Sequence, residues 1–297
     1  QLTAWSNDPV ADPPAEWLLL QDRRTRDIWS ATPCARGGAS QVLYHVTHGQ
    51  GYTAMRHRRG DVEVTVSWCV DAHTSVKQIH LQLFNHGHKT QHLRVTGLVE
   101  WMMGAIRSDR STVRTALYRQ RLPDRLPPAA QGGAPRSQKL TALLCTQQDR
   151  TAGFGQGTAF FSGVGGTEEA EDWTCDRREF FDARGRLVLP DHLSQHSGSG
   201  FDPCAAISTQ VTLGAGLADE RVFLLGYAES ADAARALATI AATLPPAQRL
   251  EESRTRWNRL LGATTVMTPD PLLDVLVNRW LLYQAVSCRL WTKAGFY

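Results

Sequence analysis

The feature of this sequence that most constrains its fold is a two-residue alternation of apolar and polar side chains, which recurs up to about residue 229. In residues 62–70 one face of the expected strand carries Val62, Val64, Val66, Trp68 and Val70. Such alternation is typical of strands that bury one side. Similar runs predict strands at 16–21, 40–46, 78–84, 93–99, 140–146, 158–162, 179–189, 205–213 and 221–227. Because no helical pattern interrupts them, the sequence predicts a large antiparallel β-sandwich.

At Ser230 the spacing of apolar residues changes to that of helices. Ser230 is a suitable N-cap, and the alanine-rich residues 231–243 favour a helix. A second helix is predicted to begin at Pro246 and to end before Gly262, since proline suits the first turn of a helix and glycine its C-terminal end. Its expected apolar face consists of Leu250, Trp257 and Leu261.

A third helix is predicted at 270–291, and its apolar side chains extend nearly all round it. One stripe consists of Leu273, Val277, Trp280, Gln284, Cys288 and Trp291, and the remaining apolar surface comes from Leu272, Leu276, Tyr283 and Val286. A helix with so little polar surface is buried on most sides. We therefore expect that further polypeptide covers it, and that this chain is a piece of a longer protein.

Composition excludes several classes of protein. The 32 Lys and Arg nearly balance the 29 Asp and Glu, so the formal net charge of +3 gives no sign of nucleic-acid binding. Nine Trp, nine Phe and six Tyr exclude a disordered chain. No stretch is long and apolar enough for a membrane span. The six cysteines form no CxxC pair, which favours buried thiols in a reducing compartment.

Histidines and carboxylates are the candidates for metal binding and catalysis. His80, His86, His88 and His92 cluster in a strand and turn without acidic neighbours, so we interpret them as exposed and predict no metal site. Glycoside cleavage requires two carboxyls on either side of a bond. The candidate pairs 168–169, 171–172 and 251–252 stand in polar loops or at a helix start, where solvated charge is expected. Asp202 is interpreted as a turn residue.

Five tryptophans leave two interpretations open. Aromatic faces suit the C–H faces of pyranose rings, so a tryptophan can serve as a sugar-stacking surface. Tryptophan is more often part of a core, and Trp68 lies on an apolar strand face. The five residues are Trp17, Trp29, Trp68, Trp101 and Trp173.

Five segments taken in order resemble glycoside hydrolase family 94, the cellobiose and chitobiose phosphorylase family. They are 48–53 (HGQGYT), 98–104 (LVEWMMG), 176–180 (DRREF), 200–206 (GFDPCAA) and 278–284 (NRWLLYQ), followed by Arg289 and Phe296-Tyr297. Each motif is short, but their shared order and spacing make the joint match specific, and it covers nearly the whole chain. Within the family, the resemblance is greatest to the C-terminal phosphorylase-like region of cyclic β-1,2-glucan synthases.

The resemblance implies a fold that agrees with the pattern of the sequence. Family members begin with a large β-supersandwich, continue through a helical linker and enter an (α/α)₆ barrel. On this basis the chain is divided into a mainly β supersandwich domain at 1–229, a helical linker at 230–265 and the truncated start of the barrel at 266–297. The helix at 270–291 is then the first barrel helix, which accounts for its apolar surface.

The resemblance also implies a chemistry, and it places most of that chemistry outside this chain. In the family, a barrel aspartate acts as general acid while inorganic phosphate, the co-substrate, attacks the anomeric carbon. That aspartate is expected beyond Tyr297, so no catalytic residue and no cofactor is assigned here, and the chain alone is expected to be inactive. Arg289 and Tyr297 are the candidate substrate-binding residues. The Pro/Gly-rich loop at 123–137 departs from the family pattern.

The expected partners are a β-glucan oligosaccharide, the remaining barrel of the parent chain and a second copy of this chain. The resemblance places the parent at the bacterial inner membrane, with this region on the cytoplasmic side. Two other interpretations stay open: a stand-alone carbohydrate-binding β-sandwich without catalysis, and an unrelated structural β-domain. The exposed apolar helix argues against a lone module.

Overall fold

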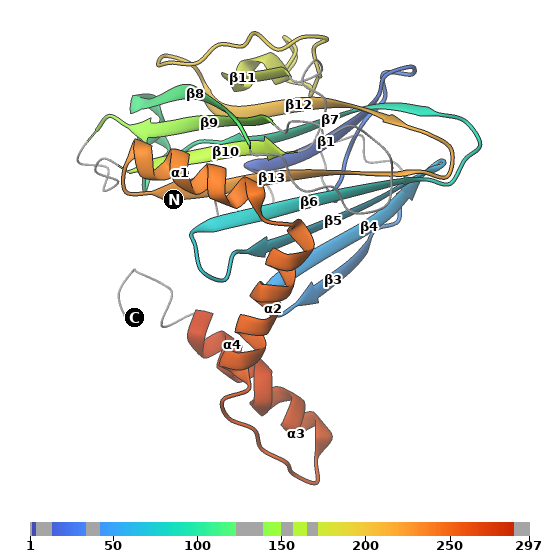
Figure 1. Ribbon diagram of the computed structural model, residues 1–297, viewed down its shortest axis with the longest axis vertical. Helices are drawn as coiled ribbons and strands as arrows, with labels where there is room; N and C mark the ends of the chain where they lie inside the picture. The colour runs from blue at the N-terminus through green and yellow to red at the C-terminus, as the bar shows by residue number, and fades with distance from the viewer. Residues whose placement is uncertain are drawn as a thin grey trace.

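The computed structural model describes residues 2–3, 14–33, 42–122, 139–149, 157–164 and 172–287. Its strands form two sheets (Figure 1). The first sheet has the order β11 (Asp172–Asp176), β12 (Pro203–Leu213), β7 (Gln91–Glu100), β1 (Glu16–Asp22) and β2 (Ile28–Ser30). The second has the order β3 (His45–Gly49), β4 (Tyr52–Arg59), β5 (Val62–Val70), β6 (Val76–Asn85), β13 (Ala218–Ala228), β10 (Thr158–Val164), β9 (Lys139–Gln147) and β8 (Val113–Arg121). Neighbouring strands pair antiparallel, which confirms the predicted mainly β fold.

The main core lies between the two sheets. Leu20 and Val95 from the first sheet meet Leu81, Phe161 and Phe223 from the second, and each is almost fully buried. The Phe161 and Phe223 rings stack with centroids 5.6 Å apart. Burying one large apolar side chain stabilises a fold by roughly 1.5–3 kcal/mol, so this layer supplies much of the stability of the sandwich.

Both sheets are also covered on their outer faces. Helix α1 (Ala231–Thr243) lies across β13, β10 and β9, and its buried positions are all alanines, which allow close approach to the sheet. Ser230 caps this helix, because its side chain accepts a hydrogen bond from the Ala233 amide. On the other sheet, the 3₁₀ turn η4 (Arg177–Phe180) brings Phe180 against Trp17 and Leu98. The central strands are therefore buried on both faces.

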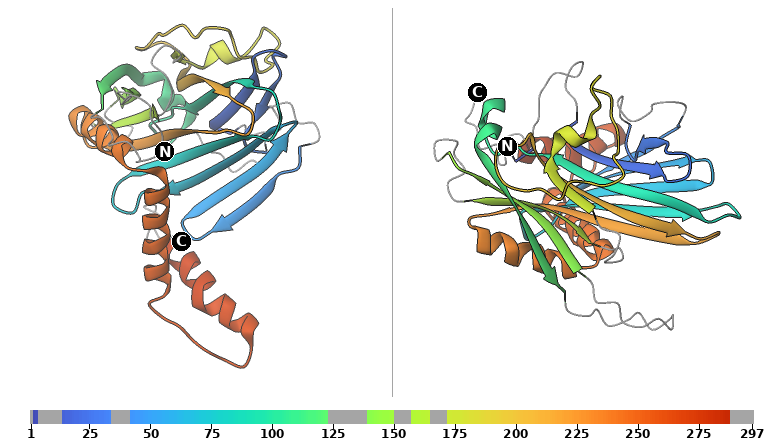
Figure 2. Two further views of the ribbon diagram at one scale, coloured as in Figure 1. Left: turned by 45° about the vertical axis from the view of Figure 1, so that its right-hand side comes forward. Right: turned by 90° about the horizontal axis from the view of Figure 1, so that it is seen from above.

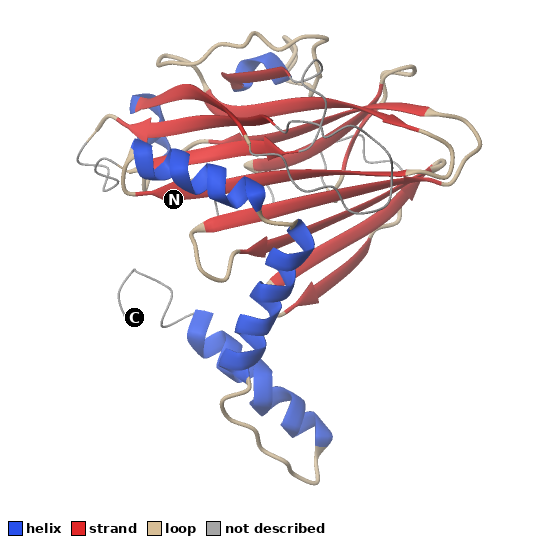
Figure 3. Cartoon of the chain, in the orientation of Figure 1, coloured by secondary structure: helices blue, strands red, loops and turns tan. Residues whose placement is uncertain are grey.

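Two further helices leave the sandwich and form a hairpin (Figure 2). Helix α2 (Pro246–Leu261) packs on β4 and β5, and a loop then leads to a second helical rod. That rod consists of α3 (Pro271–Val275), the π-helical turn η5 (Leu276–Leu281) and α4 (Leu282–Ala285), and it is called helix 271–287 below. The sheets and this helical part occupy separate regions of the molecule (Figure 3).

The sequence pattern missed some strands and misplaced two. The strand predicted at 40–46 lies further along the chain, because residues 42–44 are not in a strand and β3 spans His45–Gly49. The run at 179–189 is not a strand: it begins in η4, and only an isolated bridge joins Phe181 to Leu187. The Asp176 side chain starts that turn by accepting a hydrogen bond from the Arg178 amide. Strand β4 was missed because arginines crowd its exposed face, and β8 and β11 gave no regular alternation.

Strand β5 departs from its predicted alternation at its end. Val62, Val64 and Val66 are buried as expected, whereas Val70 is 55% exposed and Cys69 on the opposite face is buried. Cys69 is covered because α2 packs on that face of the sheet. Val70 is exposed because the end of the strand borders an open cleft, described next.

Candidate functional site

The turn between β3 and β4 is pressed against helix α2. Gly51 adopts a left-handed backbone with φ of +80°, and a Cβ atom placed there would lie 2.0 Å from the Trp257 indole. Ser253, one helical turn before Trp257, donates a hydrogen bond to the Gly51 carbonyl at 3.3 Å. Only glycine satisfies both the backbone conformation and the contact. Gly51, the second glycine of the HGQGYT motif, therefore has a packing role.

Arg279 connects this turn to both helices of the hairpin. Its Nη1 donates to Gln50 Oε1 at 2.6 Å and to Asn258 Oδ1 at 2.9 Å. The Trp257 and Tyr283 rings lie 5.0 Å apart between the same two helices. The turn, α2 and helix 271–287 are thus held together by polar and aromatic contacts at one place.

These three elements enclose a cleft of about 1400 Å³. One wall is residues 48–53 of the β3–β4 turn, and another is residues 68–75 at the end of β5 and in the loop after it. The helices complete it with Ser253, Arg256 and Trp257 from α2 and with residues between 274 and 287. The cleft exceeds the ~300–1,000 Å³ usual for small-molecule pockets, so it has room for a ligand of several rings.

A buried ion pair holds Asp71, which is one of the residues that line the cleft. Arg249 of α2 is 1% exposed, and its guanidinium donates to Asp71 Oδ2 at 2.9 Å and to Gln78 Oε1 at 2.7 Å. A third bond goes to the Ala241 carbonyl of α1. Burial alone would raise the pKa of Asp71, but hydrogen bonds from the His73 amide, Arg249 and Thr74 lower the pKa below its usual value. Asp71 is therefore an ionised structural partner of Arg249.

Cys69, the thiol that lines the cleft, is unsuited to nucleophilic chemistry. Burial raises the pKa of Cys69 to about 11, although the charge of Arg249 opposes the shift. A thiol must lose its proton to act as a nucleophile, so Cys69 is inert at neutral pH. The cleft is better suited to binding than to covalent catalysis.

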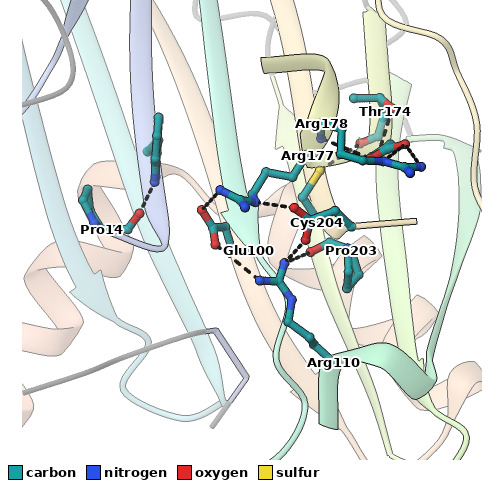
Figure 4. A network of polar contacts seen from close by, with 11 residues as sticks. Pro14, Glu100, Arg110, Thr174, Arg177, Arg178, Pro203 and Cys204 are labelled. Atoms are coloured by element: carbon teal, nitrogen blue, oxygen red, sulfur yellow. Dashed lines mark hydrogen bonds and ion pairs between the residues drawn. The ribbon is translucent and has the colours of Figure 1, made fainter. Parts of the chain in front are cut away.

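A second polar centre lies at the end of β7 (Figure 4). Glu100 is 1% exposed, and both Arg177 (3.3 Å) and Arg110 (3.9 Å) form ion pairs with it. The same two arginines hold Asp202, with Arg177 Nε 2.8 Å from Oδ2. Two cations and two anions thus balance inside the protein. The centre ties the first sheet to η1 (Arg107–Thr112) and η4.

The five motifs from the sequence therefore gather in two places. Segments 98–104, 176–180 and 200–206 supply Glu100, Arg177 and Asp202 to the buried ion cluster. Segments 48–53 and 278–284 supply Gln50 and Arg279, which meet at the cleft. No pattern of spacing predicted that Arg110 or Arg249 would join these centres, because their partners stand far away in the sequence.

Two single-residue interpretations were wrong. Asp202 is more than a turn residue, because two arginines bind its carboxylate. His80 is buried rather than exposed, since its face of the sheet is covered, and it pairs with Glu220 at 2.8 Å. His86 lies in the turn as predicted and contacts Glu63 at 3.0 Å. The predicted substrate-binding residues, Arg289 and Tyr297, lie outside the described residues, as does loop 123–137.

Four of the five tryptophans belong to the core, and the fifth borders both the core and the cleft. Trp17, Trp29, Trp101 and Trp173 are buried, so they belong to the core. Trp68 packs partly on the core and also lines the cleft. Within the described ranges, no group of three or more His, Cys, Asp or Glu side chains is placed to hold a metal ion. In the same ranges, no helix has the length and apolar character needed to cross a membrane.

Comparison with known proteins identifies relatives of the whole chain. Residues 1–242 match the profile of the glycosyl hydrolase 94 supersandwich domain. The cyclic β-(1,2)-glucan synthase NdvB of Rhizobium meliloti is 28% identical over 100% of this chain and 10% of its own length. The N,N'-diacetylchitobiose phosphorylase of Vibrio furnissii is 22% identical over 99% of this chain and 35% of its own length. The chain thus spans only a part of each relative.

Solved structures support the fold. A bacterial glucoamylase complexed with acarbose matches with a TM-score of 0.50 and 8% identity, over 84% of this chain and 32% of the glucoamylase chain. At this identity the likeness concerns the arrangement of sheets and helices alone. It agrees with the supersandwich assignment from the sequence profile.

Proposed function

Because this chain belongs to glycoside hydrolase family 94 through its supersandwich domain, we propose that it is the non-catalytic scaffold of a phosphorylase-like region acting on β-1,2-linked glucan. Its similarity to a cyclic β-(1,2)-glucan synthase supports the choice of glucan. Its similarity to a chitobiose phosphorylase supports inorganic phosphate as co-substrate of the parent. The general acid belongs to the part of the parent that follows Tyr297.

The observation that carries this proposal is the uncovered apolar side of helix 271–287. Leu272 is 80% exposed, and three more leucines on this helix are 44–50% exposed: Leu273, Leu276 and Leu281. Such a row on a soluble surface calls for a protein partner. Since the relatives are far longer than this chain, the partner we propose is the remainder of an (α/α)₆ barrel, of which this helix is the first.

The proposal includes a division of the chain and an expected setting. Residues 1–229 form the supersandwich domain, 230–265 the linker and 266–297 the start of the barrel. A second copy of the chain is a further proposed partner. We also propose that the parent is held at the bacterial inner membrane with this region on the cytoplasmic side, on the basis of the similarity to the glucan synthase.

The test is reconstitution of activity from two polypeptides. The 297-residue chain and the part of the parent that follows it are produced together and incubated with β-1,2-gluco-oligosaccharides and phosphate. We expect glucose 1-phosphate from the pair and none from the 297-residue chain alone, because the proposed general acid belongs to the part of the parent that follows Tyr297. Turnover by the chain alone, surviving purification controls, would contradict the proposal.

A matched pair of variants separates docking from general damage. Leu272→Asp together with Leu276→Asp places charge on the uncovered side of the helix and should abolish co-purification of the two polypeptides. Leu217→Asp changes a leucine that is 60% exposed elsewhere on the sandwich, and it should leave co-purification intact. Equal behaviour of the two proteins would show that the helix is not the docking surface.

A further inference from the structure

We propose that the cleft between the β3–β4 turn, α2 and helix 271–287 binds a segment of a neutral oligosaccharide chain. Trp280 and Tyr283 provide the stacking surface, and Gln50, Asn278 and Arg279 provide the polar edge. The site lies on this chain alone and is distinct from the proposed phosphorolytic centre, which belongs to the part of the parent after Tyr297. It goes beyond the scaffold role, because a scaffold needs no ligand site of its own.

The first argument is that helix 271–287 has two chemically different sides. The uncovered side is aliphatic, with leucines at 272, 273, 276 and 281. The side that lines the cleft carries an amide, a guanidinium, a phenol and a hydroxyl, from Asn278, Arg279, Tyr283 and Ser287, together with Asp274, Val275 and Trp280. Aliphatic surface suits a protein partner, whereas alternating polar groups and rings suit a ligand rich in hydroxyls.

The part of helix 271–287 that lines the cleft includes a π-helical turn, Leu276–Leu281. Val275, Arg279 and Tyr283 lie before, in and after this turn, and all three line the cleft. Such turns occur frequently at functional sites, which agrees with a binding role for this face.

The second argument is a row of aromatic rings along the cleft. Trp257 and Tyr283 have centroids 5.0 Å apart, and Trp280 stacks on Tyr283 at 6.3 Å with an interplanar angle of 21°. Trp280 is 53% exposed, so one ring face is accessible to a ligand. An apolar body with a polar tip makes tryptophan and tyrosine suitable for pyranose rings, which have apolar C–H faces and polar rims.

The third argument concerns charge and size. The charged side chains of the cleft are already engaged: Asp71 binds Arg249, Lys77 binds Glu16, Asp274 accepts hydrogen bonds from Thr268, and Arg279 is held by two amide oxygens. Arg256 donates to the Ala72 carbonyl. Arginine side chains that are fixed by protein contacts can donate hydrogen bonds to neutral hydroxyl groups of a ligand. The cleft volume of about 1400 Å³ favours a chain of several sugar units over a single ring.

The test is a titration of the 297-residue chain with a β-1,2-linked gluco-oligosaccharide of about five units, followed by tryptophan fluorescence at low protein concentration. We expect saturable binding that weakens about tenfold in Trp280→Ala and in Tyr283→Leu, because each variant removes a stacking face. Leu281→Ala is the matched control on the same helix, because Leu281 is exposed and does not line the cleft, and its affinity should equal that of the unchanged chain. Circular dichroism checks that each variant is folded.

Three results would overturn the inference. They are the absence of binding up to millimolar sugar, equal weakening in the Leu281 control, and binding of inorganic phosphate that competes with the sugar, which would identify the cleft as an anion site. The outcome is separate from that of the scaffold proposal. If the sugar does not bind but the two polypeptides reconstitute activity, the cleft inference fails and the scaffold proposal stands.

Discussion

The sandwich and helix 271–287 place leucines in opposite environments. Leu19 and Leu20 in β1 are at most 1% exposed, because each face of their sheet is covered. Leu272 and Leu276 in the helix are 80% and 45% exposed. The residue type is the same in both places. The difference in exposed fraction therefore depends on whether another part of the protein covers the leucine. The sandwich completes its own core, whereas the helix needs a cover that the described residues do not provide.

Helix α2 belongs to the region whose apolar side chains are covered, and the region that lacks a cover begins after it. One face of α2 is fully buried on the sandwich, with Arg249, Ser253, Trp257 and Leu261 at four-residue spacing. The Arg249 ion pair and the Gly51–Trp257 contact join this helix firmly to β4, β5 and the loop after β5. Helix 271–287 touches the rest through Arg279 and the aromatic rings. The comparison thus predicts different consequences for changes on either side of Gly262.

The largest expected effect comes from removing helix 271–287. Each large apolar side chain that becomes buried contributes roughly 1.5–3 kcal/mol, so several exposed leucines strongly favour association. We expect the 297-residue chain on its own to self-associate, and a chain that ends at Gly262 to be monomeric. Light scattering over a range of concentrations measures both masses. If both chains have the mass of their own monomer at every concentration, the helix is covered within the chain.

Breaking the Arg249 ion pair should produce the next largest effect. Arg249→Ala leaves the buried Asp71 carboxylate without its cation, and such losses cost about 3–5 kcal/mol. Arg254→Ala is the control: Arg254 is on the same helix, and its pair with Glu251 is exposed to solvent. That change should alter the free energy of unfolding by less than about 1 kcal/mol. Urea unfolding compares the two variants, and similar losses would contradict the role assigned to Arg249.

How much of this could be predicted from the sequence differs between the fold and the site. Strands and helices that bury one face were predicted well, as in residues 62–66 and at the Ser230 cap, because burial imposes a period on neighbouring positions. Strand β4 was missed because its exposed arginines conceal that period. The turn at 179–189 was mistaken for a strand, because its apolar residues pack on an outer face with only an isolated bridge between them.

The candidate site was less predictable, because it is built from contacts between distant segments. Arg249 and Asp71 stand 178 positions apart, and Arg279 and Gln50 stand 229 apart. No local pattern encodes such pairs. The family motifs did mark the segments that meet, but they did not show that three would form an ion cluster and two an open cleft.

A change at the β3–β4 turn tests how the helical hairpin is attached. Gly51→Ala introduces strain at positive φ and a clash with Trp257, and together these should cost about 2–3 kcal/mol. Gly60→Ala is a matched control, since Gly60 also has positive φ (+57°) but has no heavy atom within 4 Å of its added Cβ. Its cost should be about 1 kcal/mol. If thermal unfolding gives equal losses, Trp257 is not pressed against the turn.

The smallest expected effect is a loss of stability in acid that His57 causes near the edge of the sandwich. His57 in β4 is 2% exposed, and neither ring nitrogen has a hydrogen-bond partner among the described residues. Burial, aided by the charge of Arg59, lowers the pKa of His57 from 6.5 to about 4. Between these two values the unfolded chain binds the proton and the folded chain does not. The free energy of unfolding therefore decreases as pH falls from 6.5 to 4, by about 2 kcal/mol after allowance for partial screening.

Replacing His57 isolates this contribution from that of other groups that titrate in acid. His57→Phe keeps a planar ring beside Tyr44, which lies 4.7 Å from the imidazole centroid, and it removes the proton-binding site. Unfolding in urea at pH 7 and at pH 4.5 should then show a smaller loss than in the unchanged chain. His45→Gln alters an exposed histidine of the neighbouring strand and should leave the loss unchanged. An equal pH dependence in all three proteins would mean that His57 accepts its proton without unfolding the edge. In that case a proton reaches His57 in the folded chain. The interior of the sandwich is then less completely closed to solvent than the comparison with helix 271–287 assumes.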